Sequence, residues 1–216
     1  MLIYLVRHGE TYYNLQGILQ GQSDGKLNEN GIELAVQTGK AMRDIHFDCA
    51  YASPLSRAYD TCRYILDNSG NGELKIITDP RLMEINMGDW EKKKYRPGES
   101  ELDDPERLKL FFSDSFKYPG APNGETIFDV IKRTKEFLDE LTKHDTDETV
   151  LVASHGCAIR AMMNGFYDNP HDFWQGHVPY NCSVHILESK NGSTQLLEMD
   201  KVYYDKSRCI NLFKKF

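Results

Sequence analysis

The sequence lacks the features typical of exported, disulfide-bonded or membrane-spanning proteins. Its five cysteines are an odd number, and none falls in a Cys-x-x-Cys pair, which argues against a disulfide framework or a zinc knuckle. No run approaches the roughly 20 apolar residues that a membrane helix needs. The apolar start at residues 1–6 is interrupted by Arg7 and His8 before a signal peptide could form. We therefore expect an unexported, cytoplasmic protein.

Positive charge is scarce as well. The chain has 26 lysines and arginines against 33 acidic residues, which gives a net charge of −7. Proteins that bind nucleic acid normally present a basic face, so we expect no nucleic-acid partner and, without an apolar span, no membrane partner. A phosphate ligand would require a few arginines and histidines to converge in a locally positive pocket.

Short apolar runs alternate with segments of helical period along the chain. They predict strands at residues 2–6, 49–52, 74–78, 149–154, 183–187 and 195–199, the last two joined as a hairpin around Asn191-Gly192. Helices are predicted after an Asn28 cap, after Ser53 as N-cap with Pro54 as first helical residue, near 105–115, from about 127 to 141, and from Gly156. This alternation predicts an α/β fold, a three-layer sandwich in which helices flank a mainly parallel central sheet.

The length suits a single domain over residues 1–216. The stretch 88–123 is irregular, polar and rich in proline, and we expect it to form a small cap insertion. The tail at 211–216 is expected to be a docked or frayed terminus, with contact to a membrane or partner as the alternative.

Three predicted strand ends carry groups that suit a phosphate. The first strand ends in Arg7-His8-Gly9, the second leads into Ser53-Pro54-Leu55-Ser56-Arg57, and the late strand ends in Ser154-His155-Gly156. Ligands of open α/β sheets bind outside the carboxyl ends of the strands. A single histidine there is usually structural, and an arginine in a first helical turn opposes the helix dipole. The coincidence of all three groups predicts a positive pocket.

These segments resemble a known family. Leu5-Val6-Arg7-His8-Gly9-Glu10-Thr11 resembles the signature of the histidine phosphatase superfamily, which has the phosphoglycerate mutase-like fold. Residues 13–14, 20–24, 53–58, 82–91, 124–126 and 154–156 resemble its later segments in order, so the resemblance spans nearly the whole chain. Residues 85–91 look like the phosphatase branches of the family.

The resemblance implies roles for particular residues. His8 would attack phosphorus through one ring nitrogen, while a backbone carbonyl holds the other nitrogen. Glu84 would protonate the leaving group and then activate water. The implied catalytic set is Arg7, His8, Arg57, Glu84 and His155. The implied phosphate-binding set is Arg7, Asn14, Gln20, Gly21, Arg57, His155 and Gly156. No metal or cofactor is implied, since the arginines supply the charge.

We therefore expect a metal-independent phosphatase that hydrolyses small phosphomonoesters through a phosphohistidine on His8. The alternatives are a phosphoglycerate mutase, which returns the phosphoryl group to its substrate, and a non-catalytic relative that binds a phospholigand. The expected partner is a small phosphate ester, and the expected assembly is a monomer or a homodimer. The region 88–123 is short for the insertion of cofactor-dependent mutases, which favours hydrolysis.

Four other features were weighed against this interpretation. Lys92-Lys93-Lys94 is interpreted as a solvated loop face, with attraction of anionic substrates as the alternative. Cys157 is not expected to be a phosphatase nucleophile, because Met163 stands where that chemistry needs arginine. Residues 145–149 match an aspartyl phosphatase pattern but precede a strand instead of following one. His171 and His177 are expected on the surface or in packing, with pocket lining as the alternative.

Overall fold

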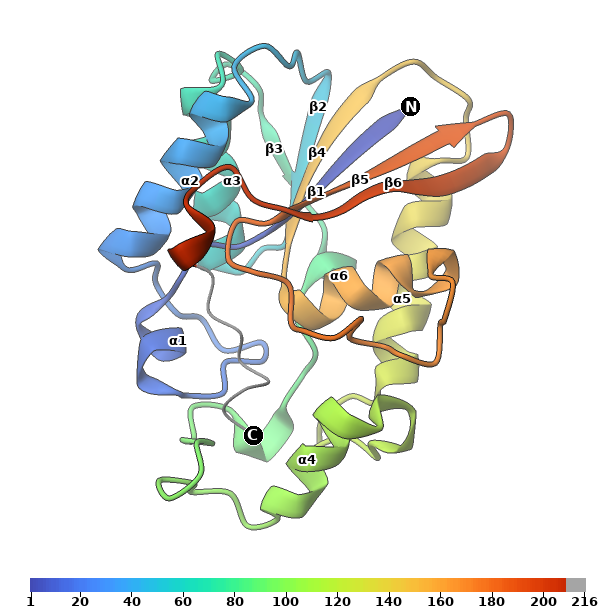
Figure 1. The fold of residues 1–216 in the computed structure, drawn as a ribbon. Helices are drawn as coiled ribbons and strands as arrows, with labels where there is room; N and C mark the ends of the chain where they lie inside the picture. The colour runs from blue at the N-terminus through green and yellow to red at the C-terminus, as the bar shows by residue number, and fades with distance from the viewer. Residues whose placement is uncertain (209–216) are drawn as a thin grey trace.

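A six-stranded sheet forms the middle layer of the protein (Figure 1). The computed structural model describes residues 1–208. The strands are β1 (Leu2–Arg7), β2 (Cys49–Ala52), β3 (Ile76–Thr78), β4 (Thr149–Ser154), β5 (Val184–Lys190) and β6 (Ser193–Lys201). Their order in the sheet is β3-β2-β4-β1-β5-β6. The first four strands in that order run parallel, and β5 and β6 each run antiparallel to the neighbour before them.

Helices cover both faces of the sheet, and the predicted three-layer sandwich is confirmed. The helices are α1 (Tyr12–Gln16), α2 (Glu29–Ala41), α3 (Ser56–Asn68), α4 (Pro105–Ser113), α5 (Ile127–Leu141) and α6 (Gly156–Met163). In Figure 1, α2 and α3 lie on one face, while α5 and α6 lie on the other. Among residues 1–208, no helix combines the length and the apolar character required to cross a membrane. The predictions for 211–216 and for Cys209 fall outside the described residues.

The central strand β1 packs on both layers because its side chains alternate between the two faces of the sheet. Ile3 and Leu5 are fully buried and pack in one core with Phe137 of α5 and Ile159 of α6. Val6 is fully buried in the opposite core, with residues of α2 and α3. Each such aliphatic side chain stabilises the fold by roughly 1.5–3 kcal/mol. Burial on both faces fixes β1, and with it the position of the residues that follow.

Two predictions from short-range sequence signals, a helix cap and a hairpin turn, are confirmed. The Asn28 side chain caps α2 by accepting a hydrogen bond from the backbone N–H of Gly31 at 2.8 Å. Asn191 and Gly192 have φ values of 53° and 73°, as a type I′ turn between β5 and β6 requires. The predicted strand at 74–78 is shorter, since only Ile76–Thr78 pairs with β2.

The predicted start of α3 is wrong. Ser53 is not its N-cap, because α3 begins at Ser56 after Leu55. The Ser53 hydroxyl instead lies 2.8 Å from Nε2 of His155. The helix N-terminus is satisfied from a distant segment, since an Asp24 carboxylate oxygen accepts bonds from both the backbone N–H and the hydroxyl of Ser56. Arg57 still lies in the first turn, as predicted.

The region 88–123 lies beyond the carboxyl ends of the parallel strands (Figure 1). It contains two short 3-10 helices, Gly88–Trp90 and Ser115–Lys117, and α4 between them. Its buried side chains, including Trp90 and Phe111, form a separate core with residues of α5 and α6. The region therefore packs over the edge of the sheet where the candidate site residues emerge.

A buried ion pair joins α6 to the antiparallel edge of the sheet. Arg160 of α6 is fully buried, and one of its terminal nitrogens donates to an Asp200 oxygen at 2.7 Å and to the His177 carbonyl at 3.0 Å. The Asp200 side chain is only 10% exposed. Removal of one member of such a pair leaves an uncompensated buried charge, which is strongly destabilising.

We expect Asp200→Asn to lower the free energy of unfolding by about 3 kcal/mol, because Arg160 is left without its counter-ion. Asparagine tolerates the positive φ of 55° at this position, so backbone strain does not confound the result. Urea unfolding measures the change. Glu198→Gln is the matched control on the same strand, since its pair with Lys201 is exposed and should be worth at most about 1 kcal/mol. Equal effects of the two substitutions would refute a stabilising role for the buried pair.

Candidate active site

The three predicted strand ends meet at one place. β1, β4 and β2 are neighbours in the sheet and run in the same direction, so His8, His155 and the start of α3 lie at a common edge. The rings of His8 and His155 are 5.1 Å apart between centroids. Nε of Arg57 donates to Nδ1 of His155 at 3.2 Å. All three side chains are buried.

His8 is held as a neutral imidazole with one nitrogen available. Its Nδ1 lies 2.7 Å from the Gly9 carbonyl oxygen, which can only accept, so Nδ1 carries the proton and Nε2 keeps its lone pair. Burial lowers the pKa of His8 well below its ordinary value, and the nearby charges of Arg57 and Arg7 lower it further. The predicted carbonyl partner of the ring is confirmed, and Nε2 has the protonation state that a nucleophile requires.

Gly9 allows this loop to pack closely against α2. A Cβ atom at position 9 would lie 2.5 Å from the backbone oxygen of Gly31, closer than such contacts can be. Glu10 serves the same loop, since it accepts a bond at 2.6 Å from Asn28. The loop after β1 is therefore fixed by backbone contact with the start of α2.

Arg57 is fully buried and is held by three partners. Its terminal nitrogens donate to the Gly21 and Ser23 carbonyl oxygens at 2.7 and 2.8 Å, and its Nε donates to His155. Burial lowers the pKa of Arg57 to about 10, while the Glu84 charge opposes that shift. The side chain stays cationic at neutral pH, and its guanidinium lines the cavity next to His8.

Arg7 supplies the second buried cation. One terminal nitrogen donates to the Pro179 carbonyl, and its Nε has no hydrogen-bond partner. Burial lowers the pKa of Arg7, and the Glu84 charge raises it. A Cβ atom at Gly156 would lie 3.5 Å from this Nε, so the glycine keeps the space in front of it open. An unpaired buried donor beside His8 is what an anion could satisfy.

His155 lies behind the cavity instead of lining it. Its Nδ1 accepts from Arg57, so its proton sits on Nε2, which points to the Ser53 hydroxyl at 2.8 Å. Burial and the charge of Arg57 lower the pKa of His155 well below its ordinary value. In this arrangement the ring orients Arg57. Its predicted contact with a phosphoryl oxygen stays a prediction.

Glu84 reaches the same cavity from the segment after β3. Its carboxylate accepts bonds from the backbone N–H groups of Cys157 and Ala158 at 3.2 and 3.1 Å, in the first turn of α6. The helix dipole favours a carboxylate at that place. Cys157 is buried, and its thiol pKa is raised by desolvation, as suits a packing role.

Arg133 of α5 is a site residue that sequence reasoning missed. Its terminal nitrogens donate to the Arg81, Met83 and Glu84 carbonyl oxygens at 2.6–3.0 Å. Its Nε and one terminal nitrogen form a two-point pair with Glu125. It thereby fixes the backbone that carries Glu84. The long helix was predicted, but no local signal indicates which of its basic residues turns inward.

One cavity of about 100 Å³ is lined by Arg7, His8, Arg57 and Glu84. Asn14, Gln20, Gly21 and Gly156, which the resemblance implied, all line it. Asn14 also forms the capping box of α1 with Thr11, and Gln20 accepts from the Thr11 hydroxyl at 3.0 Å. His171 and His177 do not line it, whereas Trp174 between them does. Lys92 and Lys94 are exposed outside the lining, and their part in attracting anions is untested.

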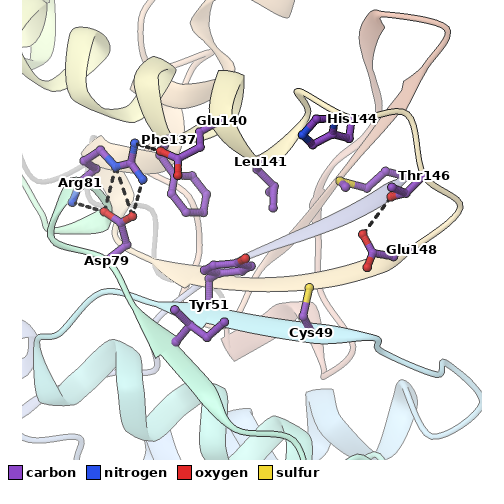
Figure 2. A pocket seen from close by; sticks show the side chains of 12 residues that line it. Cys49, Tyr51, Asp79, Arg81, Phe137, Glu140, Leu141, His144, Thr146 and Glu148 are labelled. Atoms are coloured by element: carbon purple, nitrogen blue, oxygen red, sulfur yellow. Dashed lines mark hydrogen bonds and ion pairs between the residues drawn. The ribbon is translucent and has the colours of Figure 1, made fainter.

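A larger hollow of about 570 Å³ lies elsewhere, over β2 beside α5 (Figure 2). Its arginine, Arg81, donates to Asp79 and to Glu140, so its charge is already compensated by carboxylates. Nowhere in the described part of the chain do three His, Cys, Asp or Glu side chains gather in a way that could hold a metal ion. The smaller cavity, with two arginines that form no direct ion pair with a carboxylate among the described residues and with a neutral histidine, is the better candidate.

The fold and the cavity together define an α/β protein with two buried arginines and a neutral histidine around one cavity at the carboxyl ends of parallel strands. Residues 3–201 match the family model of the histidine phosphatase superfamily, branch 1. The chain therefore belongs to the histidine phosphatase superfamily.

Relatives in this family bear both phosphatase and mutase names. The chain is 32% identical to a probable phosphoglycerate mutase GpmB of Erwinia tasmaniensis over 84% of this chain and 82% of the relative. It is 32% identical to the structure of Bacillus stearothermophilus YhfR, with a TM-score of 0.84 over 93% and 97% of the two chains. It is 26% identical to a mycobacterial glucosyl-3-phosphoglycerate phosphatase complexed with VO3, with a TM-score of 0.78 over 92% and 98%.

The buried histidines predict a pH dependence of stability. The pKa values of His8 and His155 are well below the ordinary value, and that of His185 is lowered to about 3. Below about pH 6.5 the unfolded chain binds protons that the folded chain does not. The free energy of unfolding should therefore fall as pH drops from 6.5 to 4.5, by up to about 1.4 kcal/mol per pH unit for each histidine.

Urea unfolding across that pH range measures the slope. His185→Gln should reduce it by the share of one histidine, and Ser183→Ala should leave it unchanged. Ser183 lies 3.4 Å from the His185 ring but has no titrating group, so it is the matched control. A slope that is the same in His185→Gln as in the unsubstituted protein would contradict the assignment.

Proposed function

We propose that this chain is a phosphatase that hydrolyses small phosphomonoesters without a metal, through a phosphohistidine on His8. The observation that carries the proposal is the state of His8. It is a neutral ring whose Nδ1 proton is fixed by the Gly9 carbonyl, and it lies beside two buried cations. Arg7 and Arg57 would bind the phosphoryl oxygens and stabilise the charge that grows on them in the transition state.

The proposed reaction has two steps. First, Nε2 of His8 forms a bond to phosphorus as the ester P–O bond breaks, and Glu84 gives a proton to the leaving oxygen. Second, water attacks phosphorus and gives its proton to Glu84, and the P–N bond breaks to restore the neutral ring.

The comparisons support this proposal at the level of the family. A relative with 26% identity and a TM-score of 0.78 is a phosphatase by name. A further relative at 27% identity, with a TM-score of 0.76, is a phosphoserine phosphatase of Entamoeba histolytica complexed with phosphoserine. Two finer statements rest on the geometry around His8. One is that the phosphoryl group passes to water instead of returning to the substrate, and the other is that His8 is the nucleophile.

The first test is removal of the nucleophile. We expect the protein to release phosphate from phenyl phosphate and His8→Ala to lose at least about 10⁴-fold of that rate, since the covalent route is removed. Protein quenched in alkali should carry a phosphate on His8 that is stable to base and lost in acid, detected by mass spectrometry under alkaline conditions. His171→Ala is the control, because His171 is exposed outside the cavity. Phosphate release that persists in His8→Ala would end the proposal, and inactivity of the unsubstituted protein would favour a binding module.

Mutase activity is the second candidate, because relatives at 32–33% identity are named probable phosphoglycerate mutases. The same protein incubated with 3-phosphoglycerate separates the two candidates. Free phosphate as the main product supports hydrolysis, whereas 2-phosphoglycerate without phosphate release supports the mutase.

The second test concerns Glu84 and the leaving group. We expect Glu84→Gln to lower kcat/KM for phenyl phosphate by about 10²–10⁴-fold, since the proton donor is lost. The loss should be much smaller for 4-nitrophenyl phosphate, because nitrophenolate leaves without a proton. Glu106→Gln is the control, as Glu106 pairs with the exposed Lys109 and lies outside the cavity. Equal losses for both substrates in Glu84→Gln would show that Glu84 is not the acid.

A further inference from the structure

Two chemically distinct groups of side chains line the cavity. One is the polar group around His8. The other, called the wall below, is apolar and consists of Ile18, Leu19, Ile85, Met87, Tyr95, Phe111, Phe112, Trp174 and Val178. A bound phosphate would contact the polar group, which leaves the wall to the alcohol part of the ester.

Four of the nine wall residues are aromatic, and three of these rings pack on one another. The Phe112 and Trp174 rings are stacked, 5.8 Å apart with an angle of 30° between their planes. Phe111 meets Trp174 edge to face at 5.1 Å. The Trp174 indole N–H donates to the Phe111 carbonyl at 2.8 Å, so it is used within the wall. Phe111 and Trp174 are almost completely buried, while Phe112 is partly exposed.

Charge in the cavity allows one anionic group. Among the described residues that line it, Arg7 and Arg57 are the only cations. Arg57 already donates to two carbonyls and to His155, and one terminal nitrogen of Arg7 donates to Pro179, so part of their donor capacity is used within the protein. A carboxylate on the alcohol part would be buried without a partner, which is costly.

We propose that the substrates of this site are phosphomonoesters of uncharged aromatic alcohols, whose ring packs against Phe112 and Trp174. The inference rests on the proposed phosphatase function and adds the substrate class to it. The specificity-determining residue is Phe112, because it stacks on Trp174 and is the more exposed of the two rings.

The test compares esters whose alcohols have similar leaving ability. Benzyl phosphate should have a kcat/KM about 10-fold above that of propyl phosphate, since only benzyl offers a ring to the wall. 4-Carboxybenzyl phosphate should fall about 10-fold below benzyl phosphate, because its carboxylate would be desolvated against the apolar wall without a cation of its own. If 4-carboxybenzyl phosphate or 3-phosphoglycerate is used as well as benzyl phosphate, the inference is wrong.

Variants of Phe112 locate the effect. Phe112→Ala should lower the preference for benzyl over propyl phosphate by about 5-fold, by loss of the ring contact. Phe112→Lys should raise the relative use of 4-carboxybenzyl phosphate, because it adds a cation at the wall. Leu110→Ala is the matched control, since Leu110 is on the same helix, 36% exposed, outside this cavity. An unchanged preference in both Phe112 variants would place the ring elsewhere and overturn the assignment.

A binding measurement keeps this inference separate from the proposed function. Benzylphosphonate cannot be hydrolysed, and calorimetry should show it binding about 10-fold more tightly than its 4-carboxy derivative. If no ester is hydrolysed but this order of affinities holds, the proposed hydrolysis fails and the ligand class stands. If esters are hydrolysed but the order is reversed, the ligand class fails and the phosphatase stands.

Discussion

The Arg57 guanidinium lies where a helix N-terminus disfavours a cation, and it is also fully buried. Both conditions must be offset by partners, and the partners come from distant parts of the chain. The Gly21 and Ser23 carbonyls accept its terminal nitrogens, His155 accepts its Nε, and the Glu84 charge supports its ionised form. The loop before α2, the end of β4 and the segment after β3 are thus brought together around one charge.

This constraint explains how an acidic protein can contain an anion site. The net charge of −7 is spread over the surface, while Arg7 and Arg57 are buried side by side at one edge of the sheet. In a desolvated pocket their field acts over a short range and is weakly screened, so the overall charge matters little to a ligand at His8. Burial, together with that field, lowers the pKa of His8 and keeps the ring neutral, which links the two cations to the state of the proposed nucleophile.

Sequence reasoning succeeded where the signal was local. The alternation of strands and helices, the Asn28 cap and the Asn191-Gly192 turn depend on residues a few positions apart, and each was confirmed. The meeting of His8, Arg57 and His155 could be predicted because parallel strands place their carboxyl ends at one edge. For Glu84, only the family resemblance pointed to the pocket.

The features that sequence reasoning got wrong or missed involve residues whose partners are far apart in sequence. Ser53 looked like an N-cap, yet Asp24, 32 residues before Ser56, satisfies the start of α3. Ser53 is thereby available to His155, about a hundred residues later. The aromatic wall was missed for the same reason, since Phe112 and Trp174 come from α4 and from a loop that no periodic pattern connects. Such contacts depend on how the region 88–123 folds over the sheet.

Hydrolysis and mutase chemistry share a phosphohistidine and differ in which molecule accepts its phosphoryl group, water or the dephosphorylated product. A mutase must keep the dephosphorylated product beside His8, which requires contacts that persist once the phosphate has moved to the enzyme. For a phosphoglycerate those contacts would go to its carboxylate, and the described lining residues offer no cation besides the two that hold the phosphoryl group. An uncharged aromatic alcohol would be held only by ring contacts of about 0.5–1.5 kcal/mol each, too little to retain it. The proposed substrate class and the proposed hydrolysis thus follow from one charge balance, because a product without a counter-ion leaves and water takes its place.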